Sequence, residues 1–203
     1  MKRAGFTLVE VVIALMLVIF LSYFVFVAIQ TTIGAVSLSK TQSELQSEAR
    51  SLMISLCREV ETAIQPQEAG DLLPPNVRGL EVLDNGRTIR FQIPLNEEFT
   101  RFSDPITITH ENEDRAVAGG LGNAALDAGE DANGDGMLTR RLVRQQSGQN
   151  RVIGASNNVA QVQFELLENQ DILRITLILT RFTATRPRQL VRCQIQEDVY
   201  LMN

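Results

Sequence analysis

The sequence has little of the chemistry on which metal clusters and most catalytic sites depend. Its 203 residues include two cysteines, one histidine and no tryptophan. It contains no Cys-x-x-Cys pair and no grouping of cysteine with histidine, so a zinc site of the usual kind is not expected. Around His110, no nucleophile, oxyanion hole or second histidine occurs at a recognisable spacing. We therefore interpret His110 as a solvated loop residue and expect a protein that is not an enzyme.

The chain also lacks an excess of positive charge. It carries 19 Lys and Arg against 24 Asp and Glu, for a formal net charge of -5. General binding of nucleic acid needs a basic surface, which this balance disfavours. Two local arginine clusters remain, and few aromatic residues accompany them for stacking on DNA. We interpret the clusters as ion-paired strand surface, with DNA binding as the alternative. They are Arg140, Arg141, Arg144 and Arg151, and further along Arg186, Arg188 and Arg192.

Apolar residues, by contrast, are concentrated near the N-terminus. The run from Phe6 to Ile29 contains a single charged residue, Glu10. A helix needs roughly 20 apolar residues to span a bilayer, so this run predicts a membrane-spanning helix. A carboxylate in hydrocarbon is costly unless it is paired, which predicts a partner for Glu10. A conventional secretory signal is disfavoured, because the basic leader of Lys2 and Arg3 is short and no small-x-small cleavage site follows.

The residues Gly5-Phe6-Thr7-Leu8, together with Glu10 and the apolar run, resemble the leader of type IV pilins and of the pseudopilins of type II secretion systems. The resemblance implies that residues 1–5 are a leader, that a prepilin peptidase cleaves after Gly5 and that the new terminus at Phe6 is N-methylated. It also implies that Glu10 pairs with the terminal amine of a neighbouring subunit or of its own chain. An ordinary signal anchor is the alternative.

The same resemblance implies a location. The chain would cross the inner membrane once, with its head in the periplasm or outside the cell, and would become part of a pilus or pseudopilus after assembly.

The helical pattern continues beyond the apolar run. Pro66 predicts an end near Ile64, and a continuous helix from Phe6 to Ile64 would be about 88 Å long. We expect residues 6–29 to lie in lipid or in a filament core and residues 30–65 to lie under a sheet. The apolar stripe of this second half repeats at three- and four-residue steps. It consists of Leu45, Ala49, Leu52, Leu56, Val60 and Ala63.

The remaining residues, 66–203, predict a head rich in β-structure. Asp84-Asn85-Gly86-Arg87 predicts a hairpin turn, because Asn-Gly tolerates positive φ. The fold class is therefore α+β: a long N-terminal helix, membrane-spanning in its first half, packed against an antiparallel β-sheet. This order of elements is the pilin-like fold that the resemblance implies. Alternating apolar and polar residues predict the strands. They cover 80–83, 88–93, 106–109, 140–145, 151–153, 162–166, 172–182 and 191–196.

An acidic loop, residues 111–139, contains a candidate calcium site. The stretch from Asp131 to Met137 resembles a calcium loop of the EF-hand or dockerin type, although Leu142 stands where that family has a bidentate carboxylate. Calcium takes six to eight oxygen ligands. We expect Ca²⁺ here, with a solvated acidic turn as the alternative. The expected ligands are the side chains of Asp131, Asn133 and Asp135, the main-chain carbonyl of Met137, and a carboxylate from Asp127 or Glu130.

The two cysteines each fall on a predicted core face, Cys57 on the helix and Cys193 on the last strand. A head outside the cytoplasm permits disulfides, and a bridge between these residues would add about 2–4 kcal/mol of stability. Two buried free thiols are the alternative.

Together these interpretations predict a minor pilin, a structural subunit of a type IV pilus-like filament that assembles with other pilins through its N-terminal helix. One alternative is a minor pseudopilin in the tip complex of a type II secretion system. Another, from a different class, is a DNA-binding or adhesive module on a pilin anchor.

Overall fold

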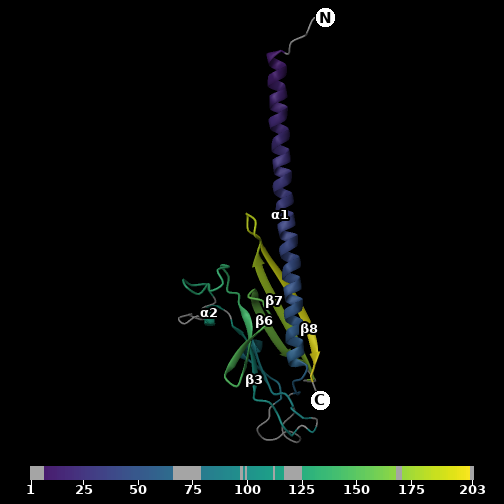
Figure 1. Cartoon of the computed structure of the whole chain (residues 1–203), viewed down its shortest axis with the longest axis vertical. Helices are drawn as coiled ribbons and strands as arrows, with labels where there is room; N and C mark the ends of the chain where they lie inside the picture. The colour runs from purple at the N-terminus through teal and green to yellow at the C-terminus, as the bar shows by residue number, and fades with distance from the viewer. Residues whose placement is uncertain are drawn as a thin grey trace.

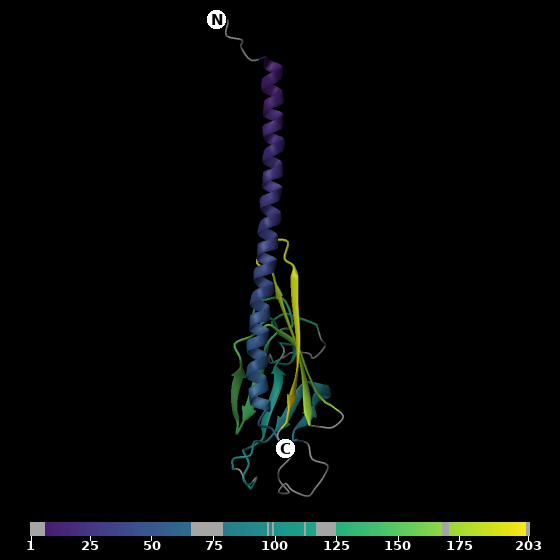
Figure 2. The same ribbon diagram turned by 90° about the vertical axis from the view of Figure 1, so that its right-hand side faces the viewer.

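The computed structural model describes residues 7–65, 79–96, 98, 100–111, 113–116, 125–167 and 171–201. One long helix is followed by a head made of β-strands, so the architecture is α+β, as the sequence predicts (Figure 1). The helix extends far beyond the head, which gives the molecule the shape of a shaft with a head at one end (Figure 2).

Helix α1 runs from Leu8 to Val60 and has 53 residues, so it is about 80 Å long. It ends four residues before the predicted boundary near Ile64. The Ala63 N–H closes a turn on the Val60 carbonyl, and the Ile64 carbonyl accepts a hydrogen bond from the Leu80 N–H at 2.9 Å. Ile64 thus leaves the helix because it pairs with extended backbone. Pro66, which predicted this end, lies outside the described residues.

The strands form two antiparallel sheets, whereas the sequence predicted one. A single isolated bridge, between Arg140 and Val159, connects the sheets within the described part of the chain. The first sheet has the order β1-β2-β3-β4-β5, with β1 Glu81–Leu83, β2 Thr88–Phe91, β3 Ile106–Glu111, β4 Arg141–Gln146 and β5 Gln149–Ile153. The second has the order β6-β7-β8, with β6 Val159–Leu166, β7 Ile172–Phe182 and β8 Leu190–Tyr200. Two short helical segments, η1 Asp84–Gly86 and α2 Glu113–Ala116, complete the described elements.

The predicted hairpin between β1 and β2 is confirmed. Asp84, Asn85 and Gly86 have φ values of 51°, 56° and 87°, the left-handed region that Asn and Gly tolerate best. Gly86 is also crowded, because a Cβ added there would lie 1.9 Å from Nε2 of Gln163. Only glycine fits this turn against β6.

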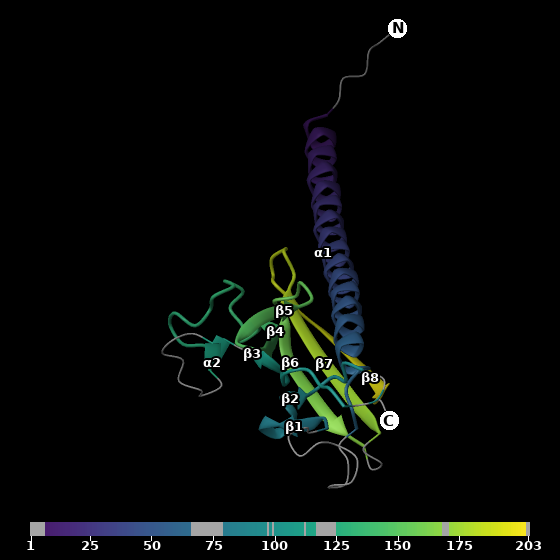
Figure 3. The ribbon, with the colours of Figure 1, turned by 60° about the horizontal axis from the view of Figure 1, so that its bottom comes forward.

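The core lies between the second half of α1 and the strands, and α1 runs along β7 and β8 (Figure 3). The predicted apolar stripe is confirmed, since each of its six members is buried. From β2, β3 and β6, the buried side chains of Phe91, Ile106, Ile108 and Phe164 join the same core. One continuous apolar cluster therefore holds both sheets to the helix.

The first half of α1 is different, because nothing in the described head covers it. Thr41 is the first buried residue of the helix, and the large apolar side chains from Leu8 to Ile29 are between 39% and 81% exposed. The most apolar 18-residue window has a mean hydropathy of 3.0. By length and composition, this half of the helix is able to cross a membrane.

Candidate functional site

The N-terminal end of α1 is closed by a reciprocal pair of hydrogen bonds between Thr7 and Glu10. The Glu10 N–H donates to Thr7 Oγ1 at 3.3 Å, and Glu10 Oε2 accepts from the Thr7 N–H at 3.0 Å. This is a capping box, which satisfies otherwise unpaired N–H groups of the first helical turn. The Glu10 carboxylate is thereby held beside the Thr7 N–H, at the first described residue of the chain. Gly5 and Phe6 themselves, the predicted processing residues, lie outside the described residues.

The acidic loop brings three carboxylates together: Asp131, Asp135 and Glu113 each place one oxygen within 4.8 Å of the others. Two of these residues belong to the predicted calcium loop. The third, Glu113, begins α2 near the start of the acidic loop, well before the calcium-like stretch from Asp131 to Met137. Oxygen ligands of this kind suit hard divalent cations, so the cluster is able to hold a metal ion.

Main-chain N–H groups orient the loop carboxylates. Asp131 Oδ1 and Oδ2 accept hydrogen bonds from the N–H groups of Asp135 and Gly136, both at 2.9 Å. Asp135 Oδ1 accepts from the Met137 N–H at 2.7 Å. Gly134 and Gly136 have φ values of 72° and 77°, which glycine adopts without strain. The Asp-x-Asn-Gly-Asp-Gly spacing therefore folds into the tight turn that the motif predicts.

Glu113 is the least satisfied member of the cluster. It is completely buried, its Oε1 accepts from the Asn133 N–H at 3.0 Å, and its Oε2 has no hydrogen-bond partner in the described part of the chain. Burial raises the pKa of the Glu113 carboxyl, the Asn133 N–H lowers it, and the negative charges of Asp135 and Asp131 raise it further. A buried oxygen without a donor is costly, and a bound cation would remove that cost.

The other predicted ligands have hydrogen-bond partners within the acidic loop. The side-chain amide of Asn133 donates to the Thr139 carbonyl at 3.0 Å, and its Oδ1 accepts from the Asp135 N–H. The Met137 carbonyl accepts from the Thr139 N–H at 2.8 Å. Glu130 is buried and accepts from the Asp127 N–H, and neither Asp127 nor Glu130 joins the carboxylate cluster among the described residues.

Sequence reasoning missed Glu113 as the third carboxylate. The only signal was a pair of acidic residues, Glu113 and Asp114, shortly after the predicted strand 106–109, and no spacing rule links that position to the stretch from Asp131 to Met137.

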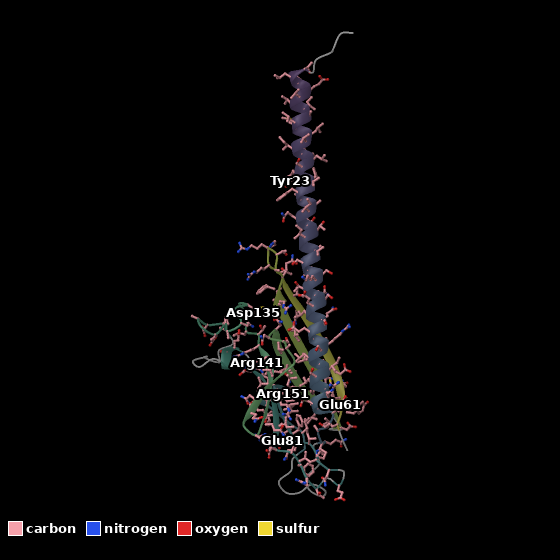
Figure 4. All side chains as sticks on the ribbon, in the orientation of Figure 1. Tyr23, Glu61, Glu81, Asp135, Arg141 and Arg151 are labelled. Atoms are coloured by element: carbon pink, nitrogen blue, oxygen red, sulfur yellow. The ribbon has the colours of Figure 1, made fainter. Side chains whose placement is uncertain are left out.

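The first arginine cluster is ion-paired, as the sequence interpretation favoured. Arg141 Nε lies 2.7 Å from Glu111 Oε2, and Arg140 Nε lies 3.7 Å from the same oxygen. Glu59 of α1 forms ion pairs with Arg151 and Arg144. The Arg144 Nε atom lies 3.0 Å from Glu59 Oε2, but this contact does not have the geometry of a hydrogen bond. Arg141 and Arg151 project from neighbouring strands of the first sheet (Figure 4).

Both cysteines are free thiols, so the predicted bridge is not formed in this structure. The charges that affect the two thiols differ. Cys193 is influenced by Arg50, whereas Cys57 is influenced by Glu197 and Glu61. Cys57 lines a pocket between α1 and β8 together with Ile195 and Glu197, which lie two and four residues beyond Cys193 on that strand.

His110 belongs to strand β3, so its interpretation as a solvated loop residue is wrong. One ring nitrogen lies 2.9 Å from the Val159 carbonyl oxygen. The ring therefore contributes a contact between the two sheets.

Beyond the chain itself, comparisons with protein-family models, with curated proteins and with solved structures find no match. The chain's own sequence and geometry therefore carry the functional interpretation.

Proposed function

We propose that this protein is a structural subunit, a minor pilin, of a type IV pilus-like filament. The observation that carries the proposal is the division of α1 into a core-forming half and a half whose large apolar side chains are exposed. An apolar surface of this size does not remain in water. Lipid covers it before assembly, and the same segment of neighbouring subunits covers it in the filament, where packing between apolar helices supplies cohesion.

The leader motif supports the processing steps of this proposal. A prepilin peptidase cleaves after Gly5, and the new terminus at Phe6 is N-methylated. The Glu10 carboxylate neutralises the terminal amine of its own chain or of a neighbour, and its capping box already holds it at the helix end. Pairing in the filament would remove the cost of a buried carboxylate and set the register between subunits.

A charge-only substitution tests the role of Glu10. Glu10→Gln retains the acceptor of the capping box, since Gln also serves at this position, but it removes the negative charge. Glu10→Ala removes both. We expect both variants to be cleaved normally and to incorporate poorly into filaments, measured by immunoblotting of membranes and of sheared filaments. Normal incorporation of Glu10→Gln would show that the charge plays no part.

A minor pseudopilin in the tip complex of a type II secretion system is the second candidate, because the same helix serves both assemblies. Deleting the gene separates them. Lost surface filaments with normal secretion support the minor pilin, and lost secretion with normal filaments supports the pseudopilin. If neither changes, both assembly roles fail.

A DNA-binding or adhesive module on a pilin anchor is the candidate from a different class. The ion pairs of Arg140, Arg141 and Arg144 with Glu111 and Glu59 weigh against DNA binding through these residues, because phosphate contacts need uncompensated positive charge. A salt-dependent gel shift by the full chain in detergent, lost when these arginines are changed to Gln, would reverse this preference.

For the acidic loop, we propose Ca²⁺ as the ion held by Glu113, Asp131 and Asp135. The exclusively oxygen donor set supports a hard cation, and the irregular loop suits the flexible geometry of calcium better than the strict octahedron of Mg²⁺. Bound calcium would stabilise the head and fix α2 against the loop.

Metal addition and removal test this assignment. At a Ca²⁺ concentration of about 100 times the dissociation constant, binding stabilises the folded state by about 2.7 kcal/mol. We expect the melting temperature of the full chain in detergent to rise with Ca²⁺, less with Mg²⁺, and to fall again with chelator. Glu113→Gln should abolish the response, and Glu165→Gln on the exposed side of β6 should retain it. An unchanged melting temperature with no calorimetric heat would refute calcium binding.

A further inference from the structure

The loop between β7 and β8, Thr183–Gln189, lies at the end of the head from which the apolar half of α1 emerges (Figure 1). The loop lies beside the helix, and residues of both line a groove of about 460 Å³ between them. Gln30 and Gly34 line the groove on the helix side, and Thr185 and Arg186 line it on the loop side.

Internal hydrogen bonds hold the loop closed. The Thr183 N–H donates to the Gln189 carbonyl at 2.9 Å, and the Gln189 N–H donates to Thr183 Oγ1 at 2.8 Å. Thr183 is buried, while Ala184 and the residues from Arg186 to Leu190 are exposed. The hydrogen bonds between Thr183 and Gln189 therefore fix the loop conformation, and the tip of the loop is exposed to solvent.

The tip is cationic and uncompensated. Arg186 and Arg188 are exposed, and neither has an ion pair in the part of the chain that the structure describes. Nitrogen atoms project from the loop into solvent (Figure 4). Arg181, further from the tip, differs because it pairs with Glu44 and Glu48 of α1.

The neighbouring part of α1 supplies no negative charge. The sequence has no acidic residue between Glu10 and Glu44. Lys40 is the only charged residue in that interval, and it is basic. The end of the head that faces the apolar half of the helix is therefore positive, although the whole chain is acidic.

The depth of the loop relative to a bilayer follows from the helix. The segment from Leu8 to Ile29 rises about 33 Å, and the hydrocarbon core of a bilayer is about 30 Å thick. Gln30 to Gly34 therefore reach the level of the lipid headgroups, and the β7–β8 loop lies beside them.

We propose that the β7–β8 loop binds anionic phospholipid headgroups through Arg186 and Arg188 while the chain is in the membrane. A guanidinium pairs well with phosphate oxygens, and a basic side chain near an anionic surface is attracted to it. The inference rests on the membrane insertion in the proposed function, and it adds that the head is held against the lipid surface before assembly.

Fluorescence quenching by lipid measures this contact. In a full chain carrying Cys57→Ala and Cys193→Ala, a fluorophore is attached at the cysteine of Ala184→Cys, an exposed position of the loop. The chain is reconstituted in phosphatidylcholine vesicles with or without phosphatidylglycerol, each with a trace of lipid bearing a nitroxide quencher on its headgroup. We expect stronger quenching with phosphatidylglycerol and loss of the difference at high salt.

Arginine variants identify the residues responsible. The double variant Arg186→Gln with Arg188→Gln should weaken docking, the binding of the β7–β8 loop to anionic lipid, by about fivefold per arginine at low salt. Arg87→Gln with Arg101→Gln carries the same change of charge on exposed side chains outside the loop and should have no effect. Arg87 directly precedes β2, toward the end of the head away from the N-terminus (Figure 3).

Equal quenching in both lipids, or quenching that survives the Arg186 and Arg188 changes, overturns the inference. Insertion is scored separately by resistance to alkaline extraction. An inserted chain without docking refutes only the headgroup contact, whereas a chain that does not insert refutes the membrane stage of the proposed function as well. A gel shift of duplex DNA that depends on Arg186 and Arg188, without any lipid effect, would reassign the loop to nucleic acid.

Discussion

At the scale of single residues, the ionisation of Cys57 is strongly suppressed. Burial raises the pKa of this thiol to about 11, and the negative charges of Glu197 and Glu61 add to the effect. The ordinary value is 9.0. Because the folded state keeps the proton more tightly, the contribution of Cys57 to stability is complete below about pH 9 and is lost as the pH rises toward 11.

The thiol reactivity of Cys57 should follow this pKa. With Cys193→Ala making Cys57 the only thiol, alkylation at pH 8 should be about 100-fold slower than that of an exposed cysteine. The rate should continue to rise up to about pH 11. Ser51→Cys, on the exposed side of α1 in a chain without the native cysteines, is the matched control. Equal rates for the two thiols at pH 8 would contradict the effect of burial.

Alanine substitutions at Gly86 and Gly148 distinguish the cost of a positive φ from the cost of crowding around an added Cβ. Gly86 and Gly148 have φ values of 87° and 77°, but of the two only Gly86 has neighbours within 4 Å of an added Cβ. Both Gly→Ala variants should lose about 1–2 kcal/mol from the left-handed conformation. Gly86→Ala should lose about 1–3 kcal/mol more from overpacking against Gln163 and Phe164. Thermal unfolding of the two variants measures the difference, and equal melting temperatures would exclude the contact with β6.

At the scale of elements, α1 is one helix with two kinds of surface. In the second half, a stripe of apolar side chains is buried under β7 and β8 while the opposite face remains exposed. In the first half, apolar residues surround the helix on all sides, as in a membrane span or a filament core. The helix is continuous through Gly34, so it connects the head directly to the apolar segment.

The packing face of α1 predicts a contrast between two neighbouring positions. Leu52 is 1% exposed in the core, and Ile54 is 62% exposed. Leu52→Ala should destabilise the head by about 2–5 kcal/mol, because it removes buried methyl groups and leaves a cavity. Ile54→Ala should change stability by less than about 0.5 kcal/mol. Unfolding curves for both variants measure the two effects, and similar losses at the two positions would contradict the orientation of the helix.

At the scale of the whole molecule, the head and the exposed half of α1 are separable. The buried core begins at Thr41, and the groove beside the β7–β8 loop begins at Gln30. Every described residue from Thr7 to Val36 is exposed. The head therefore has the complete set of core residues without the apolar segment.

Removal of residues 1–29 should therefore leave a folded head. We expect a soluble monomer whose melting temperature lies within a few degrees of that of the full chain in detergent. Circular dichroism and analytical ultracentrifugation measure these two properties. A truncated chain that aggregates or does not unfold cooperatively would show that the apolar segment contributes to the head.

Much of the fold could be predicted because its signals are local. The apolar run after Glu10, the stripe from Leu45 to Ala63 and the turn at Asn85-Gly86 each depend on residues a few positions apart, where periodicity and turn chemistry decide the structure. The helix end was predicted less well, since Ile64 leaves the helix to pair with Leu80, a distant partner.

The candidate site was predictable only in part. The spacing of Asp131 and Asp135 predicts the tight acidic turn by itself, because both residues lie within that turn. The third carboxylate, Glu113, comes from another segment, and the two expected alternatives, Asp127 and Glu130, form their own turn instead.

By itself, the sequence determined the long helix, its division into an apolar half and an amphipathic half, most strands and the acidic turn, because short-range periodicity and backbone chemistry control these features. Only the tertiary structure decided the split into two sheets and the entry of Glu113 into the carboxylate cluster. It also decided which arginines are ion-paired: Arg144 pairs with Glu59, whereas Arg186 and Arg188 have no ion pair among the described residues. The reason is physical. Strand pairing, burial of a carboxylate and compensation of a charge depend on groups far apart in the chain, and folding alone brings them within contact.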